Sequence, residues 1–477
     1  MLVDKDSGEG KSVTLKKTAS HKVEELISKE TARLQGCLGY HRGVFGCLGE
    51  QDREVYELVV REYERLRNTI QLIAAENQCS RAVLAALGSI VQNKTTEGFP
   101  GARFHGGCEV VDDMERLAAA RAKEAFRAQY VNVQPHSGSG ANQIVLAGLL
   151  ERGDSILSLR LDQGGHLSHG ARGSLSGKFF DIENYYVDRE SFLLDYDSIR
   201  EQAIKAEPKL IICGATAYSR RIDFRKFREI ADEVGAYLLA DISHISGLVM
   251  AGAHPSPVDY AHFTTTSTYK PGGPRGGLIV MGKDFDTKIK IGSKDITLWK
   301  HIEKMTFPGV QGTPYLNNIA AKAVFFKETL SEEYRVRQFA IVENAKRLSG
   351  DLLGLGFDVV TGGTDNHMVL VNVANFKEGL TGVTAQRALE ECGIIVNMNR
   401  LPYDSRSAVV TSGVRLGTPI VTKNGMGPDE MGGIAEMINA ILKKVKVTAN
   451  SEYGLDESFR DKVRGQVKDL CSRFVVC

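Results

Sequence analysis

The amino-acid sequence predicts an α/β protein with a mainly parallel sheet in a large domain and a smaller α/β domain at its C-terminal end. Two observations carry this prediction. Short apolar segments typical of buried parallel strands, KLIICG (209–214) and YLLAD (237–241), flank a helical segment in which apolar residues recur from Phe227 to Val234. The 477 residues also exceed what one hydrophobic core usually serves, so two domains are expected.

The predicted large domain begins with a helix and a long loop. Asp52 caps a helix in which apolar residues recur from Val55 to Ile70. LIAAEN (72–77) leads into a second short helix. The loop NKTTEGFPGARFHGG (93–107) is long, polar and aromatic, which is typical of a functional loop.

Helical and extended patterns alternate through the rest of the chain. They predict a helix at 114–126, a strand at 130–133, a turn at 137–142, a helix at 143–150, a strand at 155–161, an extended segment at 264–268, a strand at 276–282 and helices between 318 and 355. A second alternation has strand-like segments at 356–363, 367–373, 393–399 and 413–419. We expect an N-terminal extension (1–51) with an amphipathic segment at 23–34, an N-terminal helix and large domain (52–334) and a small domain (335–477).

Composition and charge exclude several classes of protein. The 60 Lys and Arg residues balance 59 Asp and Glu residues, so no strong field for nucleic acid or an anionic membrane surface is expected. No apolar run approaches the roughly 20 residues of a membrane span. The eight cysteines show no CxxC pair and no zinc-like spacing with histidine, so we expect reduced thiols and no metal. The N-terminal segment has no apolar signal core, which indicates a cytoplasmic protein.

Lys270 lies where a strand-like segment gives way to a tight loop. β-branched residues at 264–268 favour an extended backbone, and the prolines and glycines of 271–274 cannot continue it. A lysine held by a stiff loop and partly desolvated can have its pKa lowered until the neutral amine forms a Schiff base, as in pyridoxal phosphate enzymes. The alternative is a solvated surface lysine, and the surrounding motifs decide between the two.

Three further segments supply what a pyridoxal phosphate site requires. Ser137, Gly138 and Ser139 stand between a strand and a helix, where free backbone amides suit a phosphate. Asp241 ends a predicted parallel strand, where ligands gather, and a carboxylate there keeps a pyridine nitrogen protonated. His166 follows two glycines and suits stacking on a ring. Taken singly, each also has an ordinary structural explanation: a small-residue turn, a helix N-cap and a structural histidine.

Taken together and in order, the motifs resemble the serine hydroxymethyltransferase family. The matching motifs extend from about Asp52 to the last helix near Leu442 and include LIAAEN, EGFPGARFHGG, NVQPHSGSGAN, GGHLSHG, ATAYSRRIDF, LADISHISGLV, the Lys270 stretch, FPGVQGTP, GGTDNH and TSGVRLGTP. The resemblance implies the fold-type I, aspartate-aminotransferase-like architecture of pyridoxal phosphate enzymes. It also implies a homodimer or homotetramer with shared active sites, and reversible transfer of a one-carbon unit between serine and glycine through tetrahydrofolate.

The resemblance implies a role for each matching residue. Lys270 is the Schiff-base lysine, Asp241 the partner of the pyridine nitrogen and His166 the stacking residue. The other cofactor-binding matches are Ser137, Gly138, Ser139, Thr216, His244 and Gly312, the last for the phosphate in the partner subunit's site. Arg415 matches the arginine that pairs with the substrate carboxylate, for which a bidentate guanidinium is suited. Glu97 matches the glutamate that handles protons during one-carbon transfer, and the folate contacts are Leu161, Gly165 and Asn399.

Several residues depart from the family pattern, and they cluster around the substrate and cofactor. Active-site tyrosines are lost, since Thr95 stands where the family has a tyrosine and Phe104 with His105 where it has a Tyr-Tyr pair. Ala75 replaces a serine, Tyr269 replaces the histidine before the lysine, and the loop after the lysine is one residue shorter. A small Thr95 and a short loop open room near the amino acid's Cα, which suggests a substrate other than plain serine.

Three hypotheses follow from the sequence. The first is a tetrahydrofolate-dependent hydroxymethyltransferase acting on serine or an α-substituted relative such as α-methylserine, supported by Glu97 and Asn399. The second is a folate-independent aldolase or threonine transaldolase, in which the glycine unit of one β-hydroxy amino acid is captured by another aldehyde, and Phe104 with His105 favours it. The third is a catalytically silent family member, which the intact Lys270 argues against.

Overall fold

The structure is a computed structural model that describes residues 46–449 and 451–474. The amphipathic segment predicted at 23–34 lies outside these residues. The chain divides into two compact units, whose described parts are residues 46–67 and 68–474. In the first unit, helix α2 (Arg53–Arg67) begins where the Asp52 carboxylate accepts a hydrogen bond from the Val55 amide at 3.0 Å, which confirms the predicted cap.

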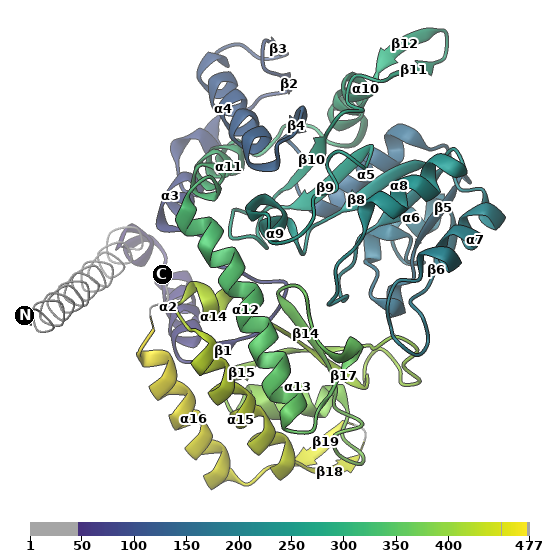
Figure 1. The fold of residues 1–477 in the computed structure, drawn as a ribbon. Helices are drawn as coiled ribbons and strands as arrows, with labels where there is room; N and C mark the ends of the chain where they lie inside the picture. The colour runs from purple at the N-terminus through teal and green to yellow at the C-terminus, as the bar shows by residue number, and fades with distance from the viewer. Residues whose placement is uncertain (1–45, 450, 475–477) are drawn as a thin grey trace, which may run out of the picture. The chain divides into compact units, whose positions relative to one another are not determined.

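A seven-stranded sheet lies in one part of the second unit, the upper part in Figure 1. Its strand order is β4-β10-β9-β8-β7-β5-β6. The five strands from β9 to β6 are parallel, which confirms the mainly parallel sheet, whereas β10 runs antiparallel to both β4 and β9. The strands are β4 (Tyr130–Asn132), β5 (Ser155–Leu159), β6 (Asp181–Tyr185), β7 (Leu210–Cys213), β8 (Tyr237–Asp241), β9 (Phe263–Ser267) and β10 (Gly277–Met281).

Helices cover both faces of this sheet. Successive strand residues point to opposite faces, so Leu157 and Leu238 join the core shared with α4, α8 and α11, whereas Ile156 and Leu239 join the core shared with α5 and α10. The helices of this part are α3 (Arg81–Leu87), α4 (Glu109–Phe126), α5 (Gly138–Leu149), α6 (Leu175–Phe179), α7 (Tyr196–Ala206), α8 (Phe224–Glu233), α9 (Ser246–Ala251), α10 (Leu298–Lys304) and α11 (Leu316–Thr329). Both faces of the sheet are thus buried, as parallel strands require.

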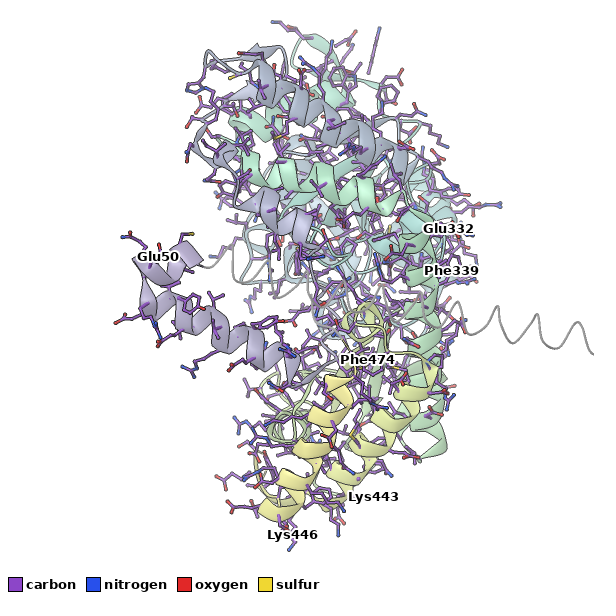
Figure 2. The ribbon with its side chains drawn as sticks, turned by 90° about the vertical axis from the view of Figure 1, so that its left-hand side faces the viewer. Glu50, Glu332, Phe339, Lys443, Lys446 and Phe474 are labelled. Carbon is purple, nitrogen blue, oxygen red and sulfur yellow. The ribbon has the colours of Figure 1, made fainter. Side chains whose placement is uncertain are left out.

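A second sheet, with the order β13-β14-β17-β16, lies in the C-terminal part of the chain and is antiparallel throughout. Its strands are β13 (Asp358–Val359), β14 (Met368–Asn372), β16 (Asn397–Asn399) and β17 (Gly413–Gly417), and the helices beside it are α12 (Glu332–Gly354), α13 (Gly382–Glu391), α14 (Pro419–Lys423), α15 (Pro428–Lys444) and α16 (Glu457–Ser472). Figure 2 shows Glu332 and Phe339 along α12. It also shows that α15 and α16 run in opposite directions, since α15 ends at the bottom near Lys443 and α16 ends higher up near Phe474. These elements share a core of their own.

An early segment of the chain belongs to this C-terminal core. Strand β1 (Ile70–Gln71) pairs in parallel with β15 (Ile394–Ile395), and Ile70 and Leu72 are fully buried in the core. The Leu72 carbonyl accepts the Gly417 amide at 2.8 Å. Segments from both sides of residue 334 therefore build one core, and the domain boundary at 334/335 stays a prediction.

Short elements complete the described chain. They are the hairpins β2 (Gly98–Phe99) with β3 (Ala102–Arg103), β11 (Lys288–Ile291) with β12 (Lys294–Thr297) and β18 (Lys446–Ala449) with β19 (Glu452–Gly454), the 3₁₀-helices η1 (Ile90–Asn93), η2 (Leu161–Gln163), η3 (Leu167–His169) and η5 (Val360–Gly362), and the π-helix η4 (Met305–Val310). None of the helices within the described ranges is both long and apolar enough to cross a membrane.

Several predicted boundaries were wrong by a few residues. The helices predicted from 114 and 143 begin at Glu109 and Gly138, and the strand predicted to 161 ends at Leu159. The early start of α5 has a local cause, because the Ser137 hydroxyl caps it by accepting the Gly140 amide at 2.9 Å. The predicted turn at 137–142 is thus the first turn of a helix.

Candidate active site

A cavity of about 230 Å³ lies where the parallel strands β5, β7, β8 and β9 end. It is lined by Ser137, Gly138, Ser139, His166, His169, Ala215, Thr216, Asp241, Ser243, His244, Ser267, Tyr269, Lys270 and Arg275. The carboxyl ends of parallel strands meet at one edge of a sheet, so residues far apart in sequence converge there. The structure thus brings together all of the predicted cofactor-binding residues except Gly312.

Asp241, the last residue of β8, is held by four hydrogen bonds. Its Oδ2 atom accepts from His169 Nε2 at 2.9 Å and from Asn142 Nδ2 at 2.8 Å, and its Oδ1 atom accepts from the backbone and side chain of Ser243 at 3.0 and 2.6 Å. Burial alone raises the pKa of Asp241, but the bonds from His169, Ser243 and Asn142 lower it well below its usual range. The buried carboxylate therefore stays ionised at neutral pH.

Lys270 lies in a stiff turn directly after β9. Gly272 has the left-handed φ of +107°, and the Gly273 amide closes the turn by donating to the Thr268 carbonyl at 3.0 Å. Asn77 Nδ2 donates to the Lys270 carbonyl at 3.0 Å. Burial lowers the pKa of the Lys270 ammonium to about 8, with Arg415 and Arg275 acting in the same direction and Asp241 in the opposite one. A pKa of about 8 leaves about a tenth of this amine neutral at pH 7.

The first turn of α5 offers backbone amides to the cavity. Helix α5 has 12 residues, and its N-terminal segment, Ser137 to Ser139, lines the cavity wall. Gly138 packs so closely that a Cβ atom there would lie 3.0 Å from the Ser267 amide nitrogen. A side chain at residue 138 would not fit there, and the N-terminal end of α5 that lines the cavity is of the kind that binds anions.

His166 and His244 face the cavity as neutral imidazoles. Burial lowers the pKa of His166 to about 4, with His169 adding to the effect. Burial also lowers the pKa of His244 well below its usual range, aided by Lys270 and Arg415. The His244 ring stacks on His367 with centroids 5.7 Å apart and an interplanar angle of 18°. An uncharged, flat wall of this kind suits a planar ligand.

Arg415, on β17 of the second sheet, does not line the cavity but bonds to the lining residue Thr216. Arg415 is 6% exposed, and its guanidinium donates to the Thr216 carbonyl at 2.6 Å and to Asn397 Oδ1 at 3.1 Å. No carboxylate among the residues that the structure describes forms a salt bridge with it. Burial lowers the pKa of Arg415 to about 10, so it remains charged at neutral pH. A buried cation with neutral partners retains donors for an anionic ligand.

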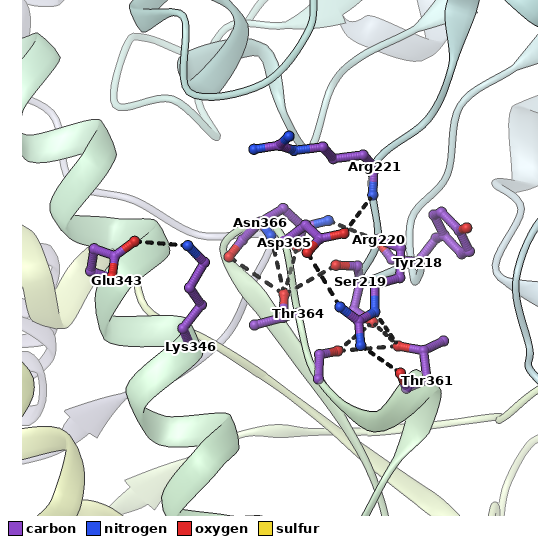
Figure 3. Close-up of polar contacts among 11 residues, drawn as sticks. Tyr218, Ser219, Arg220, Arg221, Glu343, Lys346, Thr361, Thr364, Asp365 and Asn366 are labelled. Carbon is purple, nitrogen blue, oxygen red and sulfur yellow. Dashed lines mark hydrogen bonds and ion pairs between the residues drawn. The ribbon is translucent and has the colours of Figure 1, made fainter.

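A network of polar contacts holds the turn before β14, the strand that pairs with β17 (Figure 3). It joins the loop 218–221, after β7, to the turn 361–366, before β14. Arg220 Nε donates to Thr361 Oγ1 at 3.0 Å, and its Nη1 pairs with Asp365 at 3.2 Å. We call this contact region the junction. Its first segment, 218–221, begins two residues after Thr216, whose carbonyl accepts a hydrogen bond from Arg415.

The predicted proton-transfer and substrate residues of the 93–107 loop do not line the cavity. Glu97 is half-buried just before β2, and Thr95 and His105 are exposed. Phe104 is 75% exposed. The backbone of this hairpin is nevertheless fixed, because the buried Arg103 donates to the Gly98 carbonyl at 2.5 Å.

The other predicted residues also lie outside the cavity lining. Gly312 is exposed, and the residues on either side of it, Gln311 and Thr313, bond to His136. Among the predicted folate contacts, Leu161 is 46% exposed, Gly165 is buried and Asn399 is half-buried on β16. Ala75 is half-buried next to Ala74, whose carbonyl accepts from His367 Nε2 at 3.2 Å.

Three residues around Asp241 were not predicted as site residues: His169, Asn142 and Ser243. Signals for two of them exist in the sequence. Ser243 stands two residues after Asp241, the spacing of a local side-chain turn, and Asn142 closes the SGSGAN motif. The third, His169, follows His166 by three residues, but only the folded chain places it 2.9 Å from Asp241.

The cavity can hold pyridoxal phosphate. Three buried polar atoms of lining residues, Ser267 Oγ, His244 Nδ1 and His169 Nδ1, have no hydrogen-bond partner in the described chain, as expected where a polar ligand completes the site. Lys270 suits the aldehyde, Asp241 the pyridine nitrogen and the amides of 137–139 the phosphate. The donor set therefore fits this cofactor.

Comparisons with known proteins agree with this arrangement. The sequence model of the serine hydroxymethyltransferase family matches residues 48–438. A serine hydroxymethyltransferase from Methanosarcina barkeri (strain Fusaro / DSM 804) is 49% identical over 426 residues, which cover 89% of this chain and 98% of the relative. The matched range includes Lys270, Asp241 and Arg415.

Proposed function

Because this chain belongs to the serine hydroxymethyltransferase family, we propose that the cavity around Lys270 moves a one-carbon unit from a serine-type amino acid to tetrahydrofolate. Enzymes of this family are pyridoxal phosphate-dependent hydroxymethyltransferases with tetrahydrofolate as co-substrate, and this chain is such an enzyme. The amino-acid substrate, the roles of individual residues and the subunit arrangement are parts of the proposal.

The observation that carries the proposal is the buried Arg415. Removing a guanidinium from water costs free energy unless an anion or a full set of acceptors compensates it. Its hydrogen-bond acceptors in the structure, the Thr216 carbonyl and Asn397, are uncharged. An α-amino acid carboxylate is a matching partner, and binding it here fixes which Cα bond of the substrate is aligned to break.

The chain's own residues prepare the site for the cofactor. Bound pyridoxal phosphate supplies an electron-withdrawing ring that stabilises the negative charge left at Cα when a bond there breaks. Asp241 keeps its negative charge and can hold a proton on the ring nitrogen. Lys270 supplies an amine that is neutral often enough to bind the aldehyde. His166, uncharged at neutral pH, can stack on the ring.

An α-substituted serine such as α-methylserine fits the replaced residues. Ala75 adjoins Ala74, whose Cα would lie 2.3 Å from a Cβ atom at Gly417, two residues beyond Arg415. Ala75 follows this contact directly in the chain, and in the proposed site its methyl group takes the place of the family's hydroxyl near the substrate. An apolar surface there tolerates an extra methyl group at the substrate Cα. Thr95, smaller than the tyrosine that it replaces, adds room if it reaches the site.

A shared active site would explain why Glu97 and Gly312 do not line the cavity. Both lie on exposed or half-buried segments of this chain, and the neighbouring Phe104 is 75% exposed. In a homodimer or homotetramer, Glu97 of the partner subunit supplies the proton-transfer carboxylate. Folate then contacts Leu161, Gly165 and Asn399 at the mouth of the site.

Mass-spectrometric detection of methylene-tetrahydrofolate tests the function. L-serine, α-methylserine and L-threonine are each supplied with and without tetrahydrofolate. We expect the folate product from serine or α-methylserine, and the better substrate shows whether the Cα pocket has opened. The exposed Phe104 and His105, which replace tyrosines, favour one alternative, a folate-independent aldolase or threonine transaldolase. Acetaldehyde release from threonine without any folate product would establish that alternative.

A further inference from the structure

Lys322, on α11, is a fully buried lysine that the site as described does not use. Its side chain is 1% exposed. Its Nζ atom donates to the carbonyls of Val133 at 2.5 Å, Gly277 at 2.8 Å and Pro135 at 3.3 Å. The three donor positions of the ammonium therefore all point to backbone carbonyls.

Lys322 has no carboxylate partner within salt-bridge distance in the described part of the chain. Burial lowers the pKa of its ammonium to about 7, and Glu115 acts in the opposite direction. The three carbonyl bonds also favour the charged form. Burying an ammonium costs desolvation free energy that burying a methionine or leucine side chain would not. Packing alone therefore does not explain a lysine at this position.

The three carbonyls belong to the two segments that build the cofactor site. Val133 and Pro135 lead from β4 into Ser137, and Gly277 starts β10 directly after the Lys270 turn. The two segments also touch, because the Gly277 amide donates to the Pro135 carbonyl at 2.9 Å. A Cβ atom at Gly277 would lie 2.1 Å from the Ser137 carbonyl oxygen, so only glycine fits there. Lys322 thus bonds both sides of the contact between the anion-binding turn and the lysine loop.

The charge of Lys322 also acts at this turn. The pKa of His136, the residue before Ser137, is lowered by burial and also by the positive charge of Lys322. The field of the buried ammonium therefore extends to the chain that enters α5. Buried charges are weakly screened, so an anion bound at residues 137–139 would be stabilised by the same field.

We propose that Lys322 is a positioning residue for the cofactor's phosphate group: its three bonds hold the turn before α5 against the segment that follows Lys270, and its charge favours the phosphate there. This inference rests on the proposed function for the presence of pyridoxal phosphate. It assigns Lys322 no contact with the reacting atoms.

The test compares two ligands that differ only in the phosphate. Dissociation constants of pyridoxal phosphate and of pyridoxal are measured by absorbance titration of the cofactor-free protein. For Lys322→Met we expect pyridoxal phosphate to bind at least about tenfold more weakly, with the affinity for pyridoxal changed much less. Lys322→Gln, which keeps two N–H donors without the charge, provides a second variant if the methionine variant does not fold.

Asn344→Leu is the matched control. Asn344 is 1% exposed on α12 and donates to Thr422 and to the Met426 carbonyl, away from the cavity lining. It should lower the melting temperature without changing the ratio of the two dissociation constants. If the Lys322 variants lose affinity for both ligands equally, or for neither, the proposal is wrong. A wild-type protein that binds both ligands but makes no folate product would contradict the proposed function and leave this comparison valid.

Discussion

In the proposed site, Lys270 is the side chain whose protonation state would most directly limit cofactor capture. Its pKa of about 8 means that the neutral amine becomes the major form above pH 8. A free lysine side chain titrates near pH 10.4. We expect the acylation rate of the Lys270 amine in the cofactor-free protein to rise with pH and to level off above about pH 8. Mass spectrometry measures this rate, with the free side-chain amine of Nα-acetyl-lysine as the reference. A rate that keeps rising in parallel with the reference up to pH 10 would contradict a lowered pKa.

At the residue scale, strand ends and loop chemistry made much of the cavity predictable. Asp241 and Lys270 follow recognisable strands, so their place at one sheet edge could be inferred. The partners of Asp241 could not, because His169 approaches it through a 3₁₀-helix that begins at Leu167, and short helices leave little periodic signal. Arg415 was predicted from its motif, whereas its isolation from carboxylates became visible only in the fold.

At the scale of elements, the junction holds the turn before β14, the strand that pairs with the strand of Arg415. Arg220 holds Thr361 and Asp365, and Thr361 has an unfavourable positive φ of 64° that these contacts stabilise. Arg220→Gln should loosen the turn before β14 and so raise the KM for the amino acid several-fold. The dissociation constant of pyridoxal phosphate should stay unchanged, because Arg220 does not line the cavity.

Steady-state kinetics with varied amino acid measure this effect. Arg225→Gln is the control, since Arg225 pairs with Glu229 on the exposed surface of α8 in the same stretch of chain. A rise in KM for both variants, or for neither, would contradict a specific role of the junction.

Elements buried on both sides were predicted best. β7 and β8 read as continuous apolar runs because helices cover both faces of their sheet. The direction of β10 was not predicted, although the tight turn before it favours antiparallel pairing with β9, because parallel neighbours need a longer crossover. The segment GIIVNMN was predicted as one strand but forms two, β15 and β16, which pair with different partners.

Subunit exchange tests the shared site at the scale of the whole molecule. Lys270→Ala and Glu97→Gln should each abolish most turnover. If Glu97 acts in the partner's cavity, a mixed dimer contains one intact site, and random reassembly of equal amounts should restore about a quarter of wild-type activity. The activity is measured after mild dissociation and reassociation of the mixture. No recovery, with mixed dimers verified by native mass spectrometry, would place Glu97 and Lys270 in the same subunit's site.

Buried histidines make the stability of the whole molecule fall at acidic pH. Burial lowers the pKa of His254 to about 4 and of His367 to about 3, and lowers it also for His136, His166, His244 and His262. The unfolded chain takes up protons near pH 6.5 and the folded chain does not, so the free energy of unfolding falls as the pH drops below 6.5. For His254 alone, the free energy of unfolding at pH 4 is about 3 kcal/mol lower than at neutral pH.

Urea unfolding of the cofactor-free protein from pH 7 to pH 4.5 measures this loss. His254→Asn should flatten the pH dependence because one buried titrating group is removed. An unchanged slope would show that His254 does not contribute to the acid sensitivity.

At the scale of the whole chain, the mainly parallel sheet was predictable and the route of the N-terminal segment was not. The pairing of β1 with β15 joins residues that no local pattern connects. LIAAEN was recognised as a motif, but its place in the C-terminal core depends on contacts with Gly417 and His367.

This pairing has a consequence for synthesis of the protein. Ile70 and its strand partner Ile394 are separated by more than 300 residues. At roughly 5–20 residues per second, a ribosome needs about 15 to 65 seconds to extend the nascent chain from one to the other. During that interval the fully apolar Ile70 and Leu72 have emerged without the core that buries them. The early segment is therefore a candidate chaperone-binding site until translation is nearly complete.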